Sequence, residues 1–252
     1  MSDILILRFD APLVSFGGPA VDNYRVVQAW PAASMVTGLV GNALGYDHRE
    51  FERLQRLQQR LRYVVRCDRP GSALQDYQTV NLGDTEMLPA NAGWTTWGRV
   101  EERGGSGDNK TGTHIRYRDY RADSIHTLAL TLDPAAEHPT IDDLERALMR
   151  PERPLFIGRK CCLPAGPILV RRLLASSLIT ALASEPRVTE ARTNVEPSEP
   201  LSAWWPEGET HGPVEQQRAI AVSDERDWSN QVHCGNRLLH HGLVRSPEVS
   251  DG

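Results

Sequence analysis

The pattern of apolar and polar positions predicts a mixed protein of helices and strands. Residues Ile4–Phe9 form an almost unbroken apolar run, which is typical of a buried central strand. Apolar residues recur at helical spacing in four segments: 34–45, 48–61, 140–149 and 173–183. Shorter extended runs predict strands at 62–68, 74–80, 114–121, 124–132, 166–170 and 218–223.

The helix predicted at 34–45 carries unusual glycines. Ser34 stands where an N-cap residue is expected, and Gly45 stands where a left-handed residue ends a helix. Gly38 and Gly41 lie inside the helix, where each glycine costs about 1 kcal/mol relative to alanine. Two interpretations are open: the glycine face packs closely on a sheet, or the N–H groups at the Ser34 end face a polyanion.

The order of the elements predicts the domain organisation. Strand, two helices, strand, long arm, strand, helix and strand resemble a split βαβ, ferredoxin-like α+β fold with an insertion. We expect its core in residues 1–80 and 114–185, with the glycine-rich arm 81–113 inserted. Residues 186–252 are expected to be an irregular C-terminal region with one late strand and a disordered tail from residue 246.

Charge is distributed unevenly along the 252 residues, whose net charge is −5. Residues 49–69 hold seven arginines against three acidic residues, whereas 185–252 hold twelve acidic against six basic residues. An acidic protein with local basic faces fits a component of an assembly in which one surface meets a polyanion.

The remaining composition narrows the class of protein. The four cysteines have no C-x-x-C spacing, so we expect reduced thiols and no zinc site. The N-terminus does not look like a signal peptide, and no apolar run approaches the roughly 18 residues that span a bilayer. We therefore expect a cytoplasmic protein that uses no membrane, metal or cofactor.

Two segments combine the residue types that bind nucleic acid. His114–Arg121 alternates basic and aromatic residues, an arrangement that suits single-stranded RNA but also an edge strand with its charges outward. Gly158-Arg159-Lys160 ends an apolar run and makes a compact anion site, in which the glycine allows close backbone approach. Arg25 lies in the loop before the first helix and is either a phosphate ligand or a solvated side chain.

Six segments, in order across residues 4–170, resemble Cas family five of the RAMP superfamily, the CasD-type subunits of type I-E CRISPR Cascade complexes. The matching segments are Ile4–Phe9 with Ala11–Leu13, Phe16 and Gly17; Pro31–Ser34 with Gly38–Gly45; Val65–Asp68; Asp76–Val80; Arg118–Asp123; and Phe156–Lys160 with Cys162. One departure is Ala33, which stands where the family has a basic residue.

The resemblance implies an RNA-recognition-like fold in which the arm is a β-hairpin thumb. It implies a non-catalytic, cytoplasmic subunit of an antiviral ribonucleoprotein that binds the 5′ handle of the CRISPR RNA. It would cap the backbone filament and help seat the large subunit near the target DNA's flanking motif. The predicted RNA contacts are Arg25, Ser34, Gly38, Arg116, Arg118, Gly158, Arg159 and Lys160.

Two other functions are open. The first is an endoribonuclease that processes precursor RNA, for which the candidate bases are His114, Tyr117, Tyr120 and His126. The second is an interaction domain without RNA. In that case the ridge of Arg49, Arg53, Arg56 and Arg60, on one face of the helix at 48–61, would meet an acidic protein.

Overall fold

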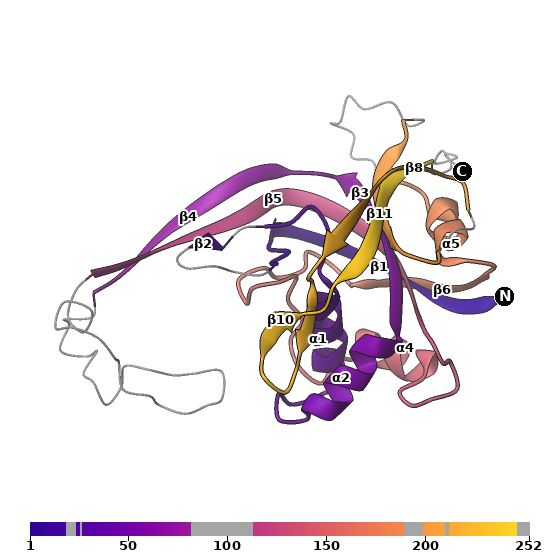
Figure 1. Cartoon of the computed structure of the whole chain (residues 1–252), viewed down its shortest axis with the longest axis horizontal. Helices are drawn as coiled ribbons and strands as arrows, with labels where there is room; N and C mark the ends of the chain where they lie inside the picture. Colours follow the sequence, from indigo (N-terminus) through magenta and orange to yellow (C-terminus); the bar gives the residue numbers. More distant parts are fainter. Residues whose placement is uncertain (19–23, 26, 82–112, 189–198, 210–211, 246–252) are drawn as a thin grey trace. The chain divides into compact units, whose positions relative to one another are not determined.

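The computed structural model describes residues 1–18, 24–25, 27–81, 113–188, 199–209 and 212–245 (Figure 1). Only the end residues of the predicted arm 81–113 are among them, and the predicted disordered tail lies outside them. The chain forms two compact units. The first holds Met1–Pro19, Val27–Leu74 and Tyr120–Gly252, and the second holds Ala20–Val26 and Gln75–Asp119.

An antiparallel sheet dominates the first unit and follows the order β6-β1-β5-β3-β7-β11-β8. These strands are β1 (Ser2–Val14), β3 (Leu61–Arg69), β5 (Thr113–Leu132), β6 (Leu169–Ala175), β7 (Leu201–Pro206), β8 (Val214–Val222) and β11 (Arg237–Val244). β5 joins the two strands predicted at 114–121 and 124–132 into one, with Asp123 at a positive φ of 62° between them. A separate ribbon pairs β9 (Glu225–Asp227) with β10 (Val232–Cys234).

The second unit is built on the first residues of β5. Both β2 (Tyr24–Arg25) and β4 (Ser72–Asn81) pair with β5. The β2 pairing is parallel and places Tyr24 opposite Tyr117. The strand predicted at 74–80 is therefore confirmed and slightly longer.

β1 is buried on both faces, as its apolar run predicts. Leu5 and Leu7 belong to the core on one face, and Ile4 and Ile6 belong to the core on the other. Successive side chains of a strand point to opposite faces, so a strand covered on both faces needs apolar residues at every position.

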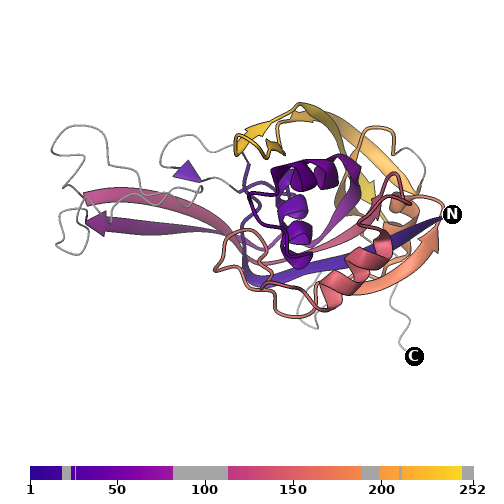
Figure 2. The same cartoon turned by 90° about the horizontal axis from the view of Figure 1, so that it is seen from below.

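Within the described parts of the chain, four helices cover the two faces of this sheet. They are α1 (Ala33–Ala43), α2 (Phe51–Arg60), α4 (Ile141–Met149) and α5 (Leu178–Ser184). Residues of α1, α2 and α4 pack in the core that contains Leu5 and Leu7, whereas α5 packs in the core that contains Ile4 and Ile6 (Figure 2). The helix predicted at 173–183 was placed too early, because β6 runs to Ala175. None of the helices in the described ranges is long and apolar enough to cross a membrane.

The start of α1 differs from the prediction. The N-cap residue is Ala32, so the prediction that Ser34 caps the helix is wrong. Asp224 takes this role from the far end of the chain: its carboxylate accepts a hydrogen bond from the Ala33 amide at 3.2 Å, and its carbonyl accepts one from the Ser34 amide at 2.9 Å. Arg237 completes the arrangement by donating two hydrogen bonds of 2.7 Å to the same carboxylate.

One of the two glycines inside α1 allows a neighbouring helix to pack closely. A Cβ on Gly41 would lie 2.6 Å from Leu54 of α2, whereas one on Gly38 would make an ordinary contact with Trp228 at 3.6 Å. Close packing, the first of the two interpretations, therefore holds at Gly41, but against α2 rather than against the sheet. Gly45 has a φ of 79° just after the helix, which confirms the predicted left-handed end.

The C-terminal region is more regular than predicted. Instead of an irregular excursion with one late strand, residues 201–244 contribute β7, β8 and β11 to the main sheet. Trp204 and Trp205 of β7 are buried in opposite cores. The predicted late strand at 218–223 is part of β8.

A buried ion pair fastens α5 to the sheet. Arg66 and Asp68, both on β3, have no exposed side-chain surface, and their side chains are joined by a hydrogen bond of 2.5 Å. The Arg66 guanidinium also donates to the carbonyls of Leu182 and Glu185 at the end of α5. The Leu182 carbonyl also accepts the Glu185 amide at 3.2 Å, so the arginine adds a second donor there and supplies one to the Glu185 carbonyl at the helix end.

Replacing Asp224 with alanine should lower the free energy of unfolding by about 3 kcal/mol, because α1 loses its cap and Arg237 loses its partner. Chemical denaturation measured by circular dichroism tests this. The matched control is Glu207→Ala, an exposed acidic residue of the same region, which should change stability by less than about 0.5 kcal/mol. Equal effects of the two substitutions would contradict the role given to Asp224.

Candidate nucleic-acid interface

The basic turn, residues 157–162, is held in one conformation by the backbone. The Ile157 amide donates to the Cys162 carbonyl and the Cys162 amide to the Arg159 carbonyl, both at 2.8 Å. Gly158 has a φ of 104°, and a Cβ there would lie 2.1 Å from the Ser15 carbonyl oxygen. Only glycine fits this position, so the sequence fixes the turn against the end of β1.

The turn presents two neighbouring cationic side chains. The guanidinium carbon of Arg159 lies 4.6 Å from the centre of the Tyr120 ring, which orients the side chain by a cation–π contact. Lys160 is exposed. An oriented guanidinium beside a solvated ammonium, on a rigid turn, is a chemistry that binds a phosphate group.

The second unit carries the basic and aromatic residues predicted at the start of β5. The β2 pairing places Arg25 opposite Arg118 along the backbone. The rings of Tyr77 and Tyr117 meet edge to face with their centres 5.6 Å apart, and Tyr77 is 56% exposed. Tyr77 is exposed and Tyr117 is half-buried, and aromatic rings of this kind offer stacking surfaces to the bases of a single strand.

Some of the predicted RNA-contact residues are buried or already bonded within the protein. Gly158, Arg159 and Lys160 form one turn of the first unit, and Arg25, Arg116 and Arg118 belong to the second unit. Ser34 is 9% exposed and its amide already binds Asp224, while Gly38 faces Trp228. The carboxylate of Asp224 thus already occupies the helix start, in the position that a phosphate would take.

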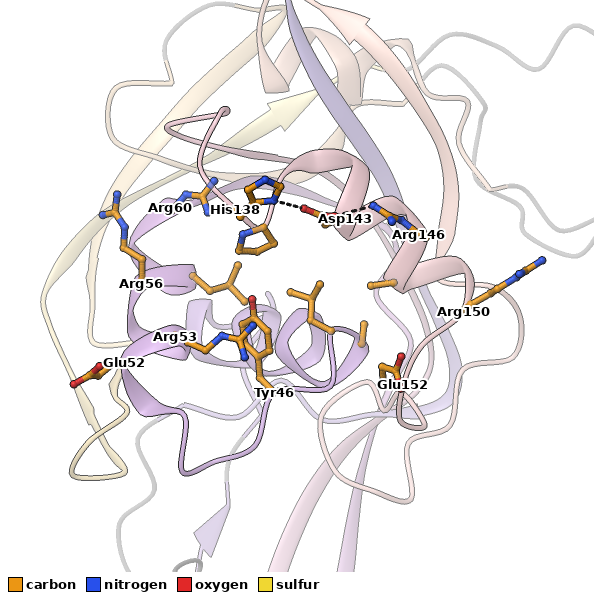
Figure 3. A pocket seen from close by; sticks show the side chains of 15 residues that line it. Tyr46, Glu52, Arg53, Arg56, Arg60, His138, Asp143, Arg146, Arg150 and Glu152 are labelled. Carbon is orange, nitrogen blue, oxygen red and sulfur yellow. Dashed lines mark hydrogen bonds and ion pairs between the residues drawn. The ribbon is translucent and has the colours of Figure 1, made fainter.

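A groove of about 780 Å³ lies beside α1 in the first unit (Figure 3). Residues of α2 form one wall and residues of α4 the other, and Figure 3 shows Arg53 and Arg56 across from Arg146 and Arg150. Its remaining lining residues are Ala43, Leu44, Tyr46, Glu52, Leu57, Arg60, His138, Pro139, Asp143, Ala147 and Glu152.

The predicted arginine ridge on α2 is only partly correct. Arg60 is fully buried, with its Nη2 donating to the carbonyls of Pro134 at 2.8 Å and Glu137 at 2.5 Å. Arg53 is paired with Glu50, and Arg56 is paired with Glu137. The ridge therefore presents partly neutralised charge to solvent.

Comparison with known proteins decides the family. The family model described as "CRISPR-associated protein (Cas_Cas5)" matches residues 4–239. The chain belongs to the Cas5 family. One relative is the "CRISPR system Cascade subunit CasD" of Escherichia coli (strain K12). It is 30% identical over 193 residues, which cover 72% of this chain and 76% of the relative.

Two solved structures share the Cas5 fold. A chain of a structure described as "CRISPR RNA-guided surveillance complex" has a TM-score of 0.64 at 22% identity, covering 99% of this chain and 94% of that chain. The "Crystal structure of Cas protein" has a TM-score of 0.61 at 23% identity, covering 96% of this chain and 95% of that chain. The family resemblance inferred from six short segments is thereby confirmed.

The candidate bases of a nuclease are poorly placed in this Cas5 chain. His126 is 1% exposed, its Nε2 lies 3.1 Å from the Ala29 carbonyl oxygen, and burial lowers its pKa to about 4. Burial also raises the pKa of Tyr120, so this phenol keeps its proton at neutral pH. His114 and Tyr117 belong to the second unit.

Sequence reasoning missed two features. The partnership of Asp224 with α1 left no signal, because 191 positions separate Asp224 from Ala33. The burial of Arg60 did leave a signal in the sequence. Arg60 stands three residues after Leu57 on α2 and therefore lies beside the apolar face of the helix.

The buried His126 should make stability depend on pH. In the unfolded chain it takes up a proton near pH 6.5, but in the folded chain only near pH 4. Acidification between these values therefore favours unfolding, by about 3 kcal/mol in total. His126→Gln should flatten this decline in urea titrations from pH 7 to 4, measured against wild type. The exposed-residue control His48→Gln should keep the wild-type decline; if His126→Gln does so too, the assignment fails.

Proposed function

We propose that this Cas5 chain is a non-catalytic subunit of a Cascade-type, RNA-guided surveillance complex and binds the 5′ handle of the CRISPR RNA. The observation that carries the proposal is the basic turn, in which Gly158 is locked and Arg159 is oriented on Tyr120. The relative named CasD is a Cascade subunit, and the neighbour of similar fold comes from an RNA-guided complex.

The strand order supports a finer view of the fold. Within the sheet, β6-β1-β5-β3 are consecutive, with α1 and α2 between β1 and β3 and with α4 between β5 and β6. This order supports our inference that these elements form a split βαβ, ferredoxin-like core. On the same view β4 and the start of β5 are the base of the thumb, whose remaining residues fall in 82–112.

Each unit supplies its own kind of RNA contact. Arg159 and Lys160 bind backbone phosphates at the turn. In the second unit, Arg116, Arg118 and Arg25 neutralise further phosphates, while Tyr77 and Tyr117 stack on unpaired bases. Phosphate contacts fix the register of the strand, and the bases of the handle add selectivity.

The wider role follows from this grip on the handle. A subunit that holds the 5′ end of the CRISPR RNA caps one end of the backbone filament. It also helps seat the large subunit, close to where the flanking motif of target DNA is read. The partners are thus the CRISPR RNA, the backbone subunits and the large subunit, in the cytoplasm.

Replacing both Arg159 and Lys160 with alanine should weaken binding of a synthetic handle RNA by about a hundredfold, because two charge-assisted contacts are lost. Fluorescence anisotropy across a series of salt concentrations measures this. The salt slope, log K against log salt, should fall by about 1.4, since each contact with a single strand contributes about 0.7.

The charge-matched control removes two exposed arginines elsewhere, as Arg49→Ala with Arg62→Ala. It should leave both the affinity and the salt slope near those of wild type. If the two double variants lose affinity equally, binding reflects overall charge and the turn is not the site.

The chain should leave RNA uncut. Incubation of the purified protein with precursor repeat RNA, in EDTA and then in Mg²⁺, should give no product on a denaturing gel, because the buried His126 and Tyr120 cannot act as bases. A discrete product that disappears in a His114→Ala variant would overturn the non-catalytic assignment and favour a processing endoribonuclease.

A further inference from the structure

One face of the second unit carries two pairs of side chains that contact each other across the strands. β4 and β5 run side by side (Figure 1), and Gln75 of β4 donates from its Nε2 to the Oδ1 of Asp119 on β5 at 2.9 Å. Two residues farther along both strands, the rings of Tyr77 and Tyr117 are in contact. Because side chains alternate between the two faces of a strand, these four share one face, which we call the tyrosine face.

The opposite face of the same strands carries the arginines. Arg116 and Arg118 alternate with Tyr117 along β5, so their side chains point away from the tyrosine face. Asp76 and Gln78 lie on that opposite face of β4, where the Gln78 Nε2 donates to the Asp76 Oδ2 at 2.5 Å. The phosphates that the arginines neutralise therefore belong to other nucleotides than one held on the tyrosine face.

The tyrosine face exposes an aromatic ring in a fixed orientation. Tyr77 is 56% exposed, and its edge-to-face contact with the half-buried Tyr117 holds the ring in place. An exposed ring of this kind stacks on an unpaired base, since every base has a π-face. Residues two apart on a strand lie about 7 Å from each other, which half the length of a base and one hydrogen bond together cover. A base stacked on Tyr77 therefore reaches Gln75 and Asp119 with its edge.

The pair of Gln75 and Asp119 presents a defined order of hydrogen-bonding groups to that edge. The Gln75 Nε2 has a second N–H to donate, and a carboxylate has about four lone-pair sites, so Asp119 can accept further bonds beside the one from Gln75. The order across the pair is donor, acceptor, acceptor. The Watson–Crick edge of guanine has the matching order, with an acceptor at O6 and donors at N1 and N2. No other RNA base has two neighbouring donors on this edge.

We propose that the tyrosine face binds one unpaired guanine of the CRISPR RNA and that Asp119 and Gln75 read its Watson–Crick edge. The guanine stacks on Tyr77, its N1–H and N2–H groups donate to the Asp119 carboxylate, and its O6 accepts from Gln75. The carboxylate repels a phosphate, so a base rather than the backbone occupies this face. The inference rests on the proposed function and deepens it by naming a base and the residues that select it.

Binding of short single-stranded RNAs by the full-length chain tests this selection. Labelled oligouridines carry guanine, adenine, cytosine or inosine at the central position, and fluorescence anisotropy gives each Kd at one fixed salt concentration. The guanine RNA should bind about tenfold more tightly than the adenine and cytosine RNAs, which cannot make the bidentate contact. Inosine keeps N1–H but lacks the N2 amino group, so the affinity of its RNA should fall between these values.

Two variants with the same loss of charge locate the contact. Asp119→Asn replaces one acceptor by a donor, so the Kd of the guanine RNA should come to within about twofold of that of the adenine RNA. The matched control is Asp76→Asn, which changes an acid that a glutamine also holds, but on the opposite face. It should keep the preference for guanine at about tenfold.

The possible outcomes distinguish this inference from the proposed function on which it rests. Equal affinities of the wild-type chain for all the RNAs would overturn the inference and leave RNA binding in place. The same holds for an inosine RNA that binds as tightly as the guanine RNA, for a preference that survives Asp119→Asn, and for one that Asp76→Asn also abolishes. A wild-type chain that binds none of these RNAs would overturn both the inference and the proposed function.

Discussion

The hydrogen bonds that Asp224 accepts from the Ala33 and Ser34 amides connect the start of α1 to the C-terminal strands. They make β8, the β9–β10 ribbon and β11 part of the same folded unit as β1 and α1, since Arg237 of β11 binds the same carboxylate. They also place a negative charge where the helix dipole is positive, which is the favourable position for it. An anion-binding helix end is thus present, but the protein uses it internally.

Because the start of α1 already binds Asp224, the RNA contacts that we propose lie elsewhere. The turn at Gly158–Lys160 packs against the end of β1, through the contact of Gly158 with Ser15. β1 is in turn the strand buried on both faces. A strand that is buried on both faces therefore positions these two cations, and this lowers the entropy lost when they bind a phosphate.

The elements that could be predicted are those fixed by local periodicity or by a special backbone conformation. β1, α2, α4 and the turn at Gly158 are of this kind. The strands after residue 200 could not be predicted, because β7 and β11 owe their place to pairing with each other and with distant β3. Arg60 of α2 shows the same limit of prediction from sequence. The helical pattern predicts an exposed cation near the apolar face, but the Arg60 guanidinium is buried and donates to the carbonyls of residues 134 and 137.

Two kinds of cationic surface result, and their selectivity differs for a physical reason. The turn offers Arg159, oriented over the Tyr120 ring, and the exposed Lys160, two neighbouring cations that suit a phosphate. The groove offers arginines of which several already face a carboxylate, above an apolar floor. Because carboxylates already offset much of the groove's charge, its cations suit a polyanion less well than those of the turn do. Both surfaces nevertheless occur on a protein whose net charge is −5.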